Sequence, residues 1–211
     1  MKKREKNFKI IRERLDYELE LGFKYVDNKV AHLYSGVFGL LVNPIVKFFY
    51  TFIARDAIVK RARKQLDVIF QCAGEYDGRN LDKIVDEHFE EYLQTEEVYI
   101  RGNRNHPKFR EVKKLEREVF KGRLEPIAML LDGDGETYEE LTRSIFPKRG
   151  EAEKYCWKQF ELADKLIQMV KGERNLVRIP SVIRTEVFAI LDSGYAFAKK
   201  TLKEQLDGTY K

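Results

Sequence analysis

The sequence FKIIRERLDYELELGFKYVDNKV (residues 8–30) has the spacing of an amphipathic helix. Its apolar residues recur every three or four positions, at Phe8, Ile11, Leu15, Leu19, Phe23, Val26 and Val30. At 3.6 residues per turn, these positions form one stripe along a helix. The segment therefore predicts a long helix near the start of the chain, with one apolar face and a charged remainder.

The same helical period recurs along most of the remaining sequence. Further helices are predicted from Arg55 to the turn at 74–78, over 81–93, 109–131 and 151–171, and from about Ser181 onward. The two strand candidates, 97–100 and 176–179, are four residues each and can equally be extended connectors. The predicted fold class is all-α, an irregular multi-helix bundle of about seven or eight helices. We expect one helical domain over 1–211, with loops at 101–107 and 132–136.

Two helix starts carry local capping signals. Asn80 precedes the apolar pattern of residues 81–93, and its side chain is suited to accept a hydrogen bond from a free helix amide. Thr137 and Glu140 have the spacing of a capping box, in which each side chain satisfies the other residue's amide. A short helix is therefore predicted after Thr137, ending before Pro147.

The segment 30–54 is unusually apolar for this chain, since its only charged residue is Lys47. It is long enough to cross a bilayer, which takes about 20 apolar residues. However, Asn43, Pro44 and Lys47 lie near its centre, and proline disrupts the helical hydrogen bonds there. We expect a kinked apolar central segment, or a hairpin of two short helices. Three environments are open to it: the core of the bundle, a membrane surface, or a groove on a protein partner.

Charge is arranged in blocks rather than spread evenly. The net charge is +5. Basic blocks lie at 2–14, 55–64 and 101–123, and acidic blocks lie at 82–97 and 132–140. Blocks of opposite sign favour helices that pair with one another, or a homodimer, at least as well as a nucleic-acid surface. The two cysteines, Cys72 and Cys156, are far apart in helical patterns, so we expect free thiols in a cytoplasmic protein.

The loop Arg101-Gly102-Asn103-Arg104-Asn105-His106 suggests one activity. Its Arg-x4-His spacing resembles that of the all-α HEPN ribonucleases. The resemblance implies that Arg101 holds the scissile phosphate and that His106 moves a proton at the 2′-oxygen, without a metal. Basic residues of the following helix would extend an RNA-binding surface: Lys108, Arg110, Lys113, Lys114 and Arg117.

The first functional hypothesis is a non-enzymatic binding protein, peripheral at the membrane. It would engage an anionic membrane surface, a lipid or a partner helix through residues 36–64. The residues expected to make these contacts are Phe48, Phe49, Phe52, Arg55, Lys60, Arg61, Arg63 and Lys64. The alternative is an RNA-binding protein or ribonuclease that uses Arg101, Arg104 and His106. The sequence predicts no cofactor and no metal site, and it leaves open whether the protein is an enzyme.

Overall fold

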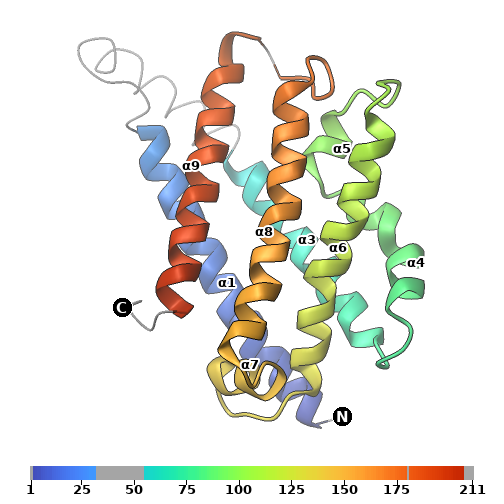
Figure 1. The fold of residues 1–211 in the computed structure, drawn as a ribbon, viewed down its shortest axis with the longest axis vertical. Helices are drawn as coiled ribbons and strands as arrows, with labels where there is room; N and C mark the ends of the chain where they lie inside the picture. The colour runs from blue at the N-terminus through green and yellow to red at the C-terminus, as the bar shows by residue number, and fades with distance from the viewer. Residues whose placement is uncertain (1, 32–54, 180, 207–211) are drawn as a thin grey trace. The chain divides into compact units, whose positions relative to one another are not determined.

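The computed structural model describes residues 2–31, 55–179 and 181–206. Within these ranges lie eight helices and no strand, so the all-α multi-helix bundle is confirmed (Figure 1). The helices are α1 (Lys2–Ala31), α3 (Arg55–Glu75), α4 (Leu81–Leu93), α5 (Glu97–Arg101), α6 (Phe109–Asp132), α7 (Tyr138–Ile145), α8 (Arg149–Gly172) and α9 (Ser181–Leu206). The predicted kink at Asn43-Pro44 lies outside the described residues.

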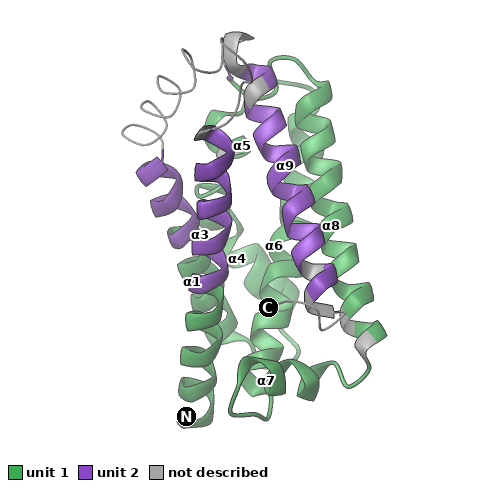
Figure 2. Ribbon diagram, turned by 90° about the vertical axis from the view of Figure 1, so that its left-hand side faces the viewer, with its two compact units in different colours: residues 1–15, 64–178 green, residues 16–63, 179–211 purple. Residues whose placement is uncertain are grey.

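The chain divides into two compact units, shown in different colours in Figure 2. Unit 1 comprises residues 1–15 and 64–178, and unit 2 comprises residues 16–63 and 179–211. The long helices α1 and α3 each contribute to both units. The expectation of a single domain over the whole chain remains a prediction.

The core of unit 1 forms around α6, which packs against α4, α7 and α8. Its centre is aromatic: the rings of Tyr92 and Phe120 stack with centroids 4.2 Å apart, and both side chains are fully buried. Further buried side chains come from α1, α3 and α7, including Ile11, Phe70 and Leu141. Five of the helices, α1, α3, α4, α6 and α7, thus meet in one apolar core, as their apolar stripes require.

Oppositely charged blocks pair within unit 1. Basic residues of α6 contact acidic residues of α4, in the pairs Lys113–Glu90, Arg117–Asp86, Arg117–Asp82 and Lys121–Asp82. Basic residues of α1 contact the acidic segment around α7, in the pairs Lys3–Asp134, Lys6–Glu136 and Arg14–Glu139. Pairing between helices therefore accounts for much of the charge patterning.

Local signals decide some helix boundaries and not others. The capping box of α7 is present: Thr137 Oγ1 accepts from the Glu140 amide, and the Glu140 carboxylate accepts from the Thr137 amide. Asn80 makes no side-chain cap on α4. Its side chain instead accepts from the Asp77 amide and donates to the Glu75 carbonyl, so it stabilises the preceding turn. Residues 97–101 form the short helix α5 rather than a strand.

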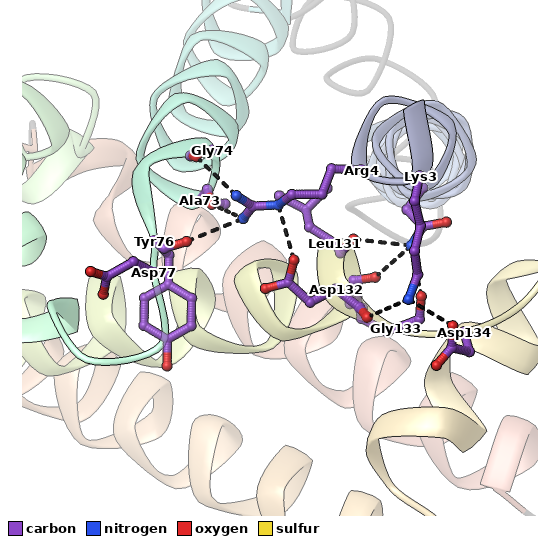
Figure 3. Close-up of polar contacts among 12 residues, drawn as sticks. Lys3, Arg4, Ala73, Gly74, Tyr76, Asp77, Leu131, Asp132, Gly133 and Asp134 are labelled. Atoms are coloured by element: carbon purple, nitrogen blue, oxygen red, sulfur yellow. Dashed lines mark hydrogen bonds and ion pairs between the residues drawn. The ribbon is translucent and has the colours of Figure 1, made fainter. Parts of the chain in front are cut away.

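The first turn of α1 neutralises the carboxyl ends of two other helices (Figure 3). The Arg4 guanidinium donates to the carbonyls of Ala73, Gly74 and Tyr76 at the end of α3, at 3.1–3.3 Å. Its Nε lies 3.1 Å from the Asp132 carboxylate at the end of α6. The last carbonyls of a helix have no partner within it and carry partial negative charge, so a cation is well placed there.

Asn7, one turn further along α1, completes this arrangement. Its side chain is almost fully buried. Nδ2 lies 3.0 Å from the Leu131 carbonyl, 2.9 Å from that of Gly133 and 3.5 Å from that of Leu130. The Gly133 amide also donates to the Leu130 carbonyl at 3.1 Å, so the buried Asn7 amide mainly serves the carbonyls of Leu131 and Gly133 at the end of α6.

Replacing Asn7 with alanine is expected to lower the free energy of unfolding by about 1–3 kcal/mol, because buried carbonyls lose their donor. Urea unfolding followed by circular dichroism measures the change. Lys9→Ala is the control, since Lys9 is exposed on the same helix and pairs with Glu13 at 3.9 Å; a change below about 0.5 kcal/mol is expected there. Equal unfolding midpoints for Asn7→Ala and the parent protein would contradict the capping role.

Candidate functional site

The proposed membrane or partner site begins in the segment 32–54, which the structure does not describe. Phe48, Phe49 and Phe52 therefore lie outside the described residues. The five basic residues of the site lie at the start of α3. Among them, Arg55 donates from Nε to both carboxylate oxygens of Asp27 at 3.0 Å.

The pair Asp27–Arg55 joins the end of α1 to the start of α3 within unit 2. A second pair lies further from these ends, with a guanidinium nitrogen of Arg63 3.8 Å from the Glu20 carboxylate. The earlier residue of α1, Glu20, pairs with the later residue of α3, Arg63, whereas Asp27 pairs with Arg55. The two helices therefore run antiparallel here. The described residues on either side of the apolar segment are thus held side by side.

Several side chains around this helix pair face solvent. Lys60 and Lys64 are exposed and lie one turn apart on α3. Ile58, just before them, is 41% exposed. Lys24 and Lys29 are exposed near the end of α1, where Lys29 lies over the ring of Tyr25 at 5.4 Å. Exposed cations therefore occur on both helices that flank the apolar segment, and an exposed apolar side chain, Ile58, occurs on α3. No described helix is long and apolar enough to cross a bilayer.

The second candidate site is the loop between α5 and α6. The segment after α8 holds this loop in place through the isolated bridge between Gly102 and Val177. The Asn103 amide donates to the Leu176 carbonyl at 2.8 Å, and the Arg178 amide donates to the Arg101 carbonyl at 3.0 Å. The candidate strand 176–179 is thus an extended connector with a single bridge.

Gly102 is required by the close approach of this loop to α5 and α6. A Cβ atom at this position would lie 2.3 Å from the Val98 carbonyl oxygen and 2.4 Å from the Phe109 ring. Because one of these atoms belongs to the backbone, a larger residue would displace the turn. The loop therefore has a defined path between its flanking helices.

His106 is held by its surroundings. Its Nδ1 accepts a hydrogen bond from the Lys108 amide at 3.1 Å, so Nε2 carries the hydrogen when the ring is neutral. Nε2 lies 3.9 Å from the Glu173 carboxylate. In this tautomer Nε2 cannot accept a proton, which a general base must do. In this tautomer His106 is not set up as a base at Nε2, the atom that faces Glu173.

A hollow of about 320 Å³ lies beside the loop. Among the described residues, its walls are Ile100, Gly102, Asn103, Arg104, Asn105 and Arg178. Arg101 and His106 do not take part in the lining. Of the three residues predicted for an RNA site, only Arg104 lines the hollow, and Arg178 joins it from a distant part of the sequence.

The basic helix predicted to extend an RNA surface is largely engaged elsewhere. Hydrogen bonding to Lys121 is the main cause that lowers the pKa of Asp82, and hydrogen bonding to Lys113 lowers that of Glu90. Hydrogen bonding to Asp86 raises the pKa of Arg117. These contacts direct one face of α6 toward α4, while Arg110 and Lys114 remain exposed.

A buried polar cluster in unit 1 was not predicted from the sequence. Glu96 Oε1 accepts hydrogen bonds from Gln65, from the Tyr92 hydroxyl and from Arg123, at 2.5, 2.9 and 3.1 Å. Glu116 lies nearby, fully buried, and neither of its carboxylate oxygens has a hydrogen-bond partner among the described residues. The signal for it was present, because Glu116 occupies the apolar stripe of α6 four residues from Val112.

The environment of this cluster changes its ionisation. Burial raises the pKa of Glu116 to about 8; the Glu96 carboxylate adds to the rise and the Arg123 guanidinium opposes it. Burial also raises the pKa of Tyr92. Partial desolvation acts against the charged guanidinium of Arg123, whose side chain keeps 42% of its surface exposed, but Tyr92, Glu96 and Glu116 together raise its pKa. Burial thus favours the neutral form of the Glu116 carboxyl.

The remaining ionisable side chains offer no metal centre in the part of the chain that is described, where no group of three or more histidine, cysteine or acidic residues converges. Comparison with protein-family models, curated proteins and solved structures finds no match to this chain. The all-α bundle and the two candidate sites are thus the basis for a functional proposal.

Proposed function

We propose that the protein is a non-enzymatic binding protein that engages an anionic membrane surface through residues 36–64. The observation that carries the proposal is the Asp27–Arg55 ion pair, with two N–O distances of 3.0 Å. It places the two described ends that flank residues 32–54, the end of α1 and the start of α3, next to each other. This geometry suits a shallow insertion better than a single crossing.

The charges around the helix pair support the same function. Lys24, Lys29, Lys60 and Lys64 are exposed on the helices that flank the apolar segment. Each lysine close to an anionic bilayer contributes about 1 kcal/mol to binding. The apolar segment itself contains four phenylalanines and a tyrosine between residues 38 and 52, side chains that favour the interface between lipid and water.

Phe48→Asp/Phe49→Asp is expected to abolish binding to vesicles that contain phosphatidylserine, because it places two carboxylates in the inserted segment. Lys60→Gln/Lys64→Gln should weaken binding about 10- to 30-fold at low salt, as about 2 kcal/mol of attraction is lost. Co-sedimentation with vesicles at low and high salt measures both effects. Circular dichroism establishes that each variant retains its helices.

Lys154→Gln/Lys158→Gln is the matched control. These two lysines are also exposed and lie one turn apart, on α8. The control changes the net charge equally and should leave vesicle binding unchanged. If the parent protein does not sediment with anionic vesicles at low salt, or if both lysine variants weaken binding equally, the proposed surface is wrong.

RNA binding is the second candidate, favoured by the position of Arg104 in the hollow beside the loop. RNA binding through this loop predicts an affinity that falls steeply with salt. Catalysis would further predict RNA cleavage that His106→Ala abolishes. Binding without cleavage is the result expected from the hydrogen bond between His106 and the Lys108 amide.

A further inference from the structure

The hollow beside the α5–α6 loop joins two segments that are about 70 residues apart in the sequence. Its volume, about 320 Å³, falls at the lower end of the range of small-molecule sites, about 300–1,000 Å³. A site of this size accommodates a ligand of roughly mononucleotide dimensions. Both sides of the hollow belong to unit 1.

The backbone fixes the positions of the two arginines that line the hollow. The amides of Asn103 and Arg178 each donate across to the opposite segment, at 2.8 and 3.0 Å. Arg104 is positioned further by its side chain, whose guanidinium lies 4.4 Å from the centre of the Tyr99 ring. The Tyr99 hydroxyl in turn donates to Glu90 at 3.1 Å. The main chain of both segments and the side chain of Arg104 are thus ordered before a ligand binds, which lowers the entropic cost of binding.

The chemistry of the lining favours an anion with several acceptor oxygens. Arg104 and Arg178 supply two positive charges and only donors. Asn103 and Asn105 add amide groups, and no carboxylate is among the lining residues of this part of unit 1. A phosphate monoester carries a charge of about −1.5 to −2 at pH 7, with three strong acceptor oxygens. Two guanidinium groups match that charge and geometry.

One wall of the hollow is apolar. Ile100 is 46% exposed there, although it is a large aliphatic residue. A planar ring packed against Ile100 would remove this surface from water. The amides of Asn103 and Asn105 could then pair with donors and acceptors on the edge of such a ring. The combination fits a nucleoside phosphate better than inorganic phosphate.

We propose that this hollow is a binding site for a nucleoside monophosphate, whose phosphate group is held between Arg104 and Arg178. The site is separate from the membrane surface proposed above, and neither proposal depends on the other. Arg178 is its distinguishing residue, because the RNA hypothesis based on the loop alone does not include it.

Isothermal titration of the full-length protein with AMP, inorganic phosphate and adenosine tests the site. Saturable binding of AMP is expected, with at least tenfold weaker binding of phosphate and of adenosine. Arg178→Gln should weaken AMP binding by tenfold or more, because a charge-assisted bidentate contact is lost. Arg104→Gln should have a similar effect.

Arg174→Gln is the matched control, since Arg174 is exposed four residues before Arg178 and does not line the hollow. It should bind AMP as the parent protein does. Absence of saturable AMP binding, or equal weakening by Arg174→Gln and Arg178→Gln, would overturn the site. Adenosine binding as tight as that of AMP would overturn the role of the phosphate, and equal binding of inorganic phosphate would overturn the role of the nucleoside.

Discussion

Glu116→Gln is expected to stabilise the protein, by an amount that increases with pH. The carboxyl is fully buried without a hydrogen-bond partner, and its pKa rises from an ordinary value of 4.5 to about 8. Between these values the folded protein keeps the proton and the unfolded chain releases it. Rising pH therefore favours unfolding of the parent protein, and the loss levels off above about pH 8.

The size of this effect follows from the shift. One pKa unit corresponds to about 1.4 kcal/mol, so the loss approaches roughly 4–5 kcal/mol as an upper bound. Glutamine has nearly the same shape and does not ionise. The two proteins should therefore have similar stability near pH 4.5, and the glutamine variant should gain about 2–4 kcal/mol by pH 8.

Urea unfolding at pH 5, 6.5 and 8 measures the difference between the two proteins. Glu118→Gln is the control, because Glu118 is exposed on the same helix. Its stability should follow that of the parent protein across the pH series. Parallel pH profiles for the parent and Glu116→Gln would show that Glu116 ionises normally in the folded state.

Phe120→Ala is expected to lower the free energy of unfolding by about 3–5 kcal/mol, because it leaves a large cavity at the centre of unit 1. The ring is fully buried and stacks on Tyr92, with a second ring, Phe89, 6.4 Å away. Thermal and urea unfolding measure the loss. Phe120→Leu keeps much of the volume and should lose less than half as much.

The two substitutions should not be additive. Phe120 lies one turn from Glu116 on α6 and stacks on Tyr92, whose hydroxyl bonds to Glu96. A cavity at Phe120 gives water a route toward the buried carboxyl, which lowers its pKa and reduces the benefit of glutamine. At pH 8 the double variant should therefore gain less from Glu116→Gln than the parent does. If the two changes in the free energy of unfolding simply add, Phe120 and Glu116 do not influence each other, and this expectation is wrong.

The helices could be predicted from the sequence because their apolar residues repeat at the helical period. Helix α1 is one example, and the capping box of α7 is a case in which local chemistry alone determines a boundary. Residues 97–101 could not be assigned this way, since a segment of five residues has no period to read. In the structure this segment is the helix α5, and its Tyr99 ring packs against Phe109 at the start of α6, with centroids 5.9 Å apart. A tertiary contact of this kind cannot be read from five residues of sequence.

The candidate sites were less accessible to sequence reasoning. The charge blocks indicated pairing between helices, but pairing partners such as Arg117 and Asp86 depend on how α4 and α6 pack. Arg178 lies in a connector without periodicity, so nothing in the sequence places it beside Arg104. Glu116 was missed because a single acidic residue within an apolar stripe is weak evidence against the many charged residues of this chain.

The capping contact of Asn7 also determines when the N-terminal helix can reach its final position. Asn7 donates to carbonyls that lie 123, 124 and 126 residues later in the chain. At a synthesis rate of about 5–20 residues per second, these acceptors emerge roughly 6–25 seconds after Asn7 itself. In the later part of that interval the apolar segment that follows α1 is already made while the end of α6 is not. The contacts of Asn7 with the end of α6 therefore form only late in synthesis, after the N-terminal helix and the segment that follows it are complete.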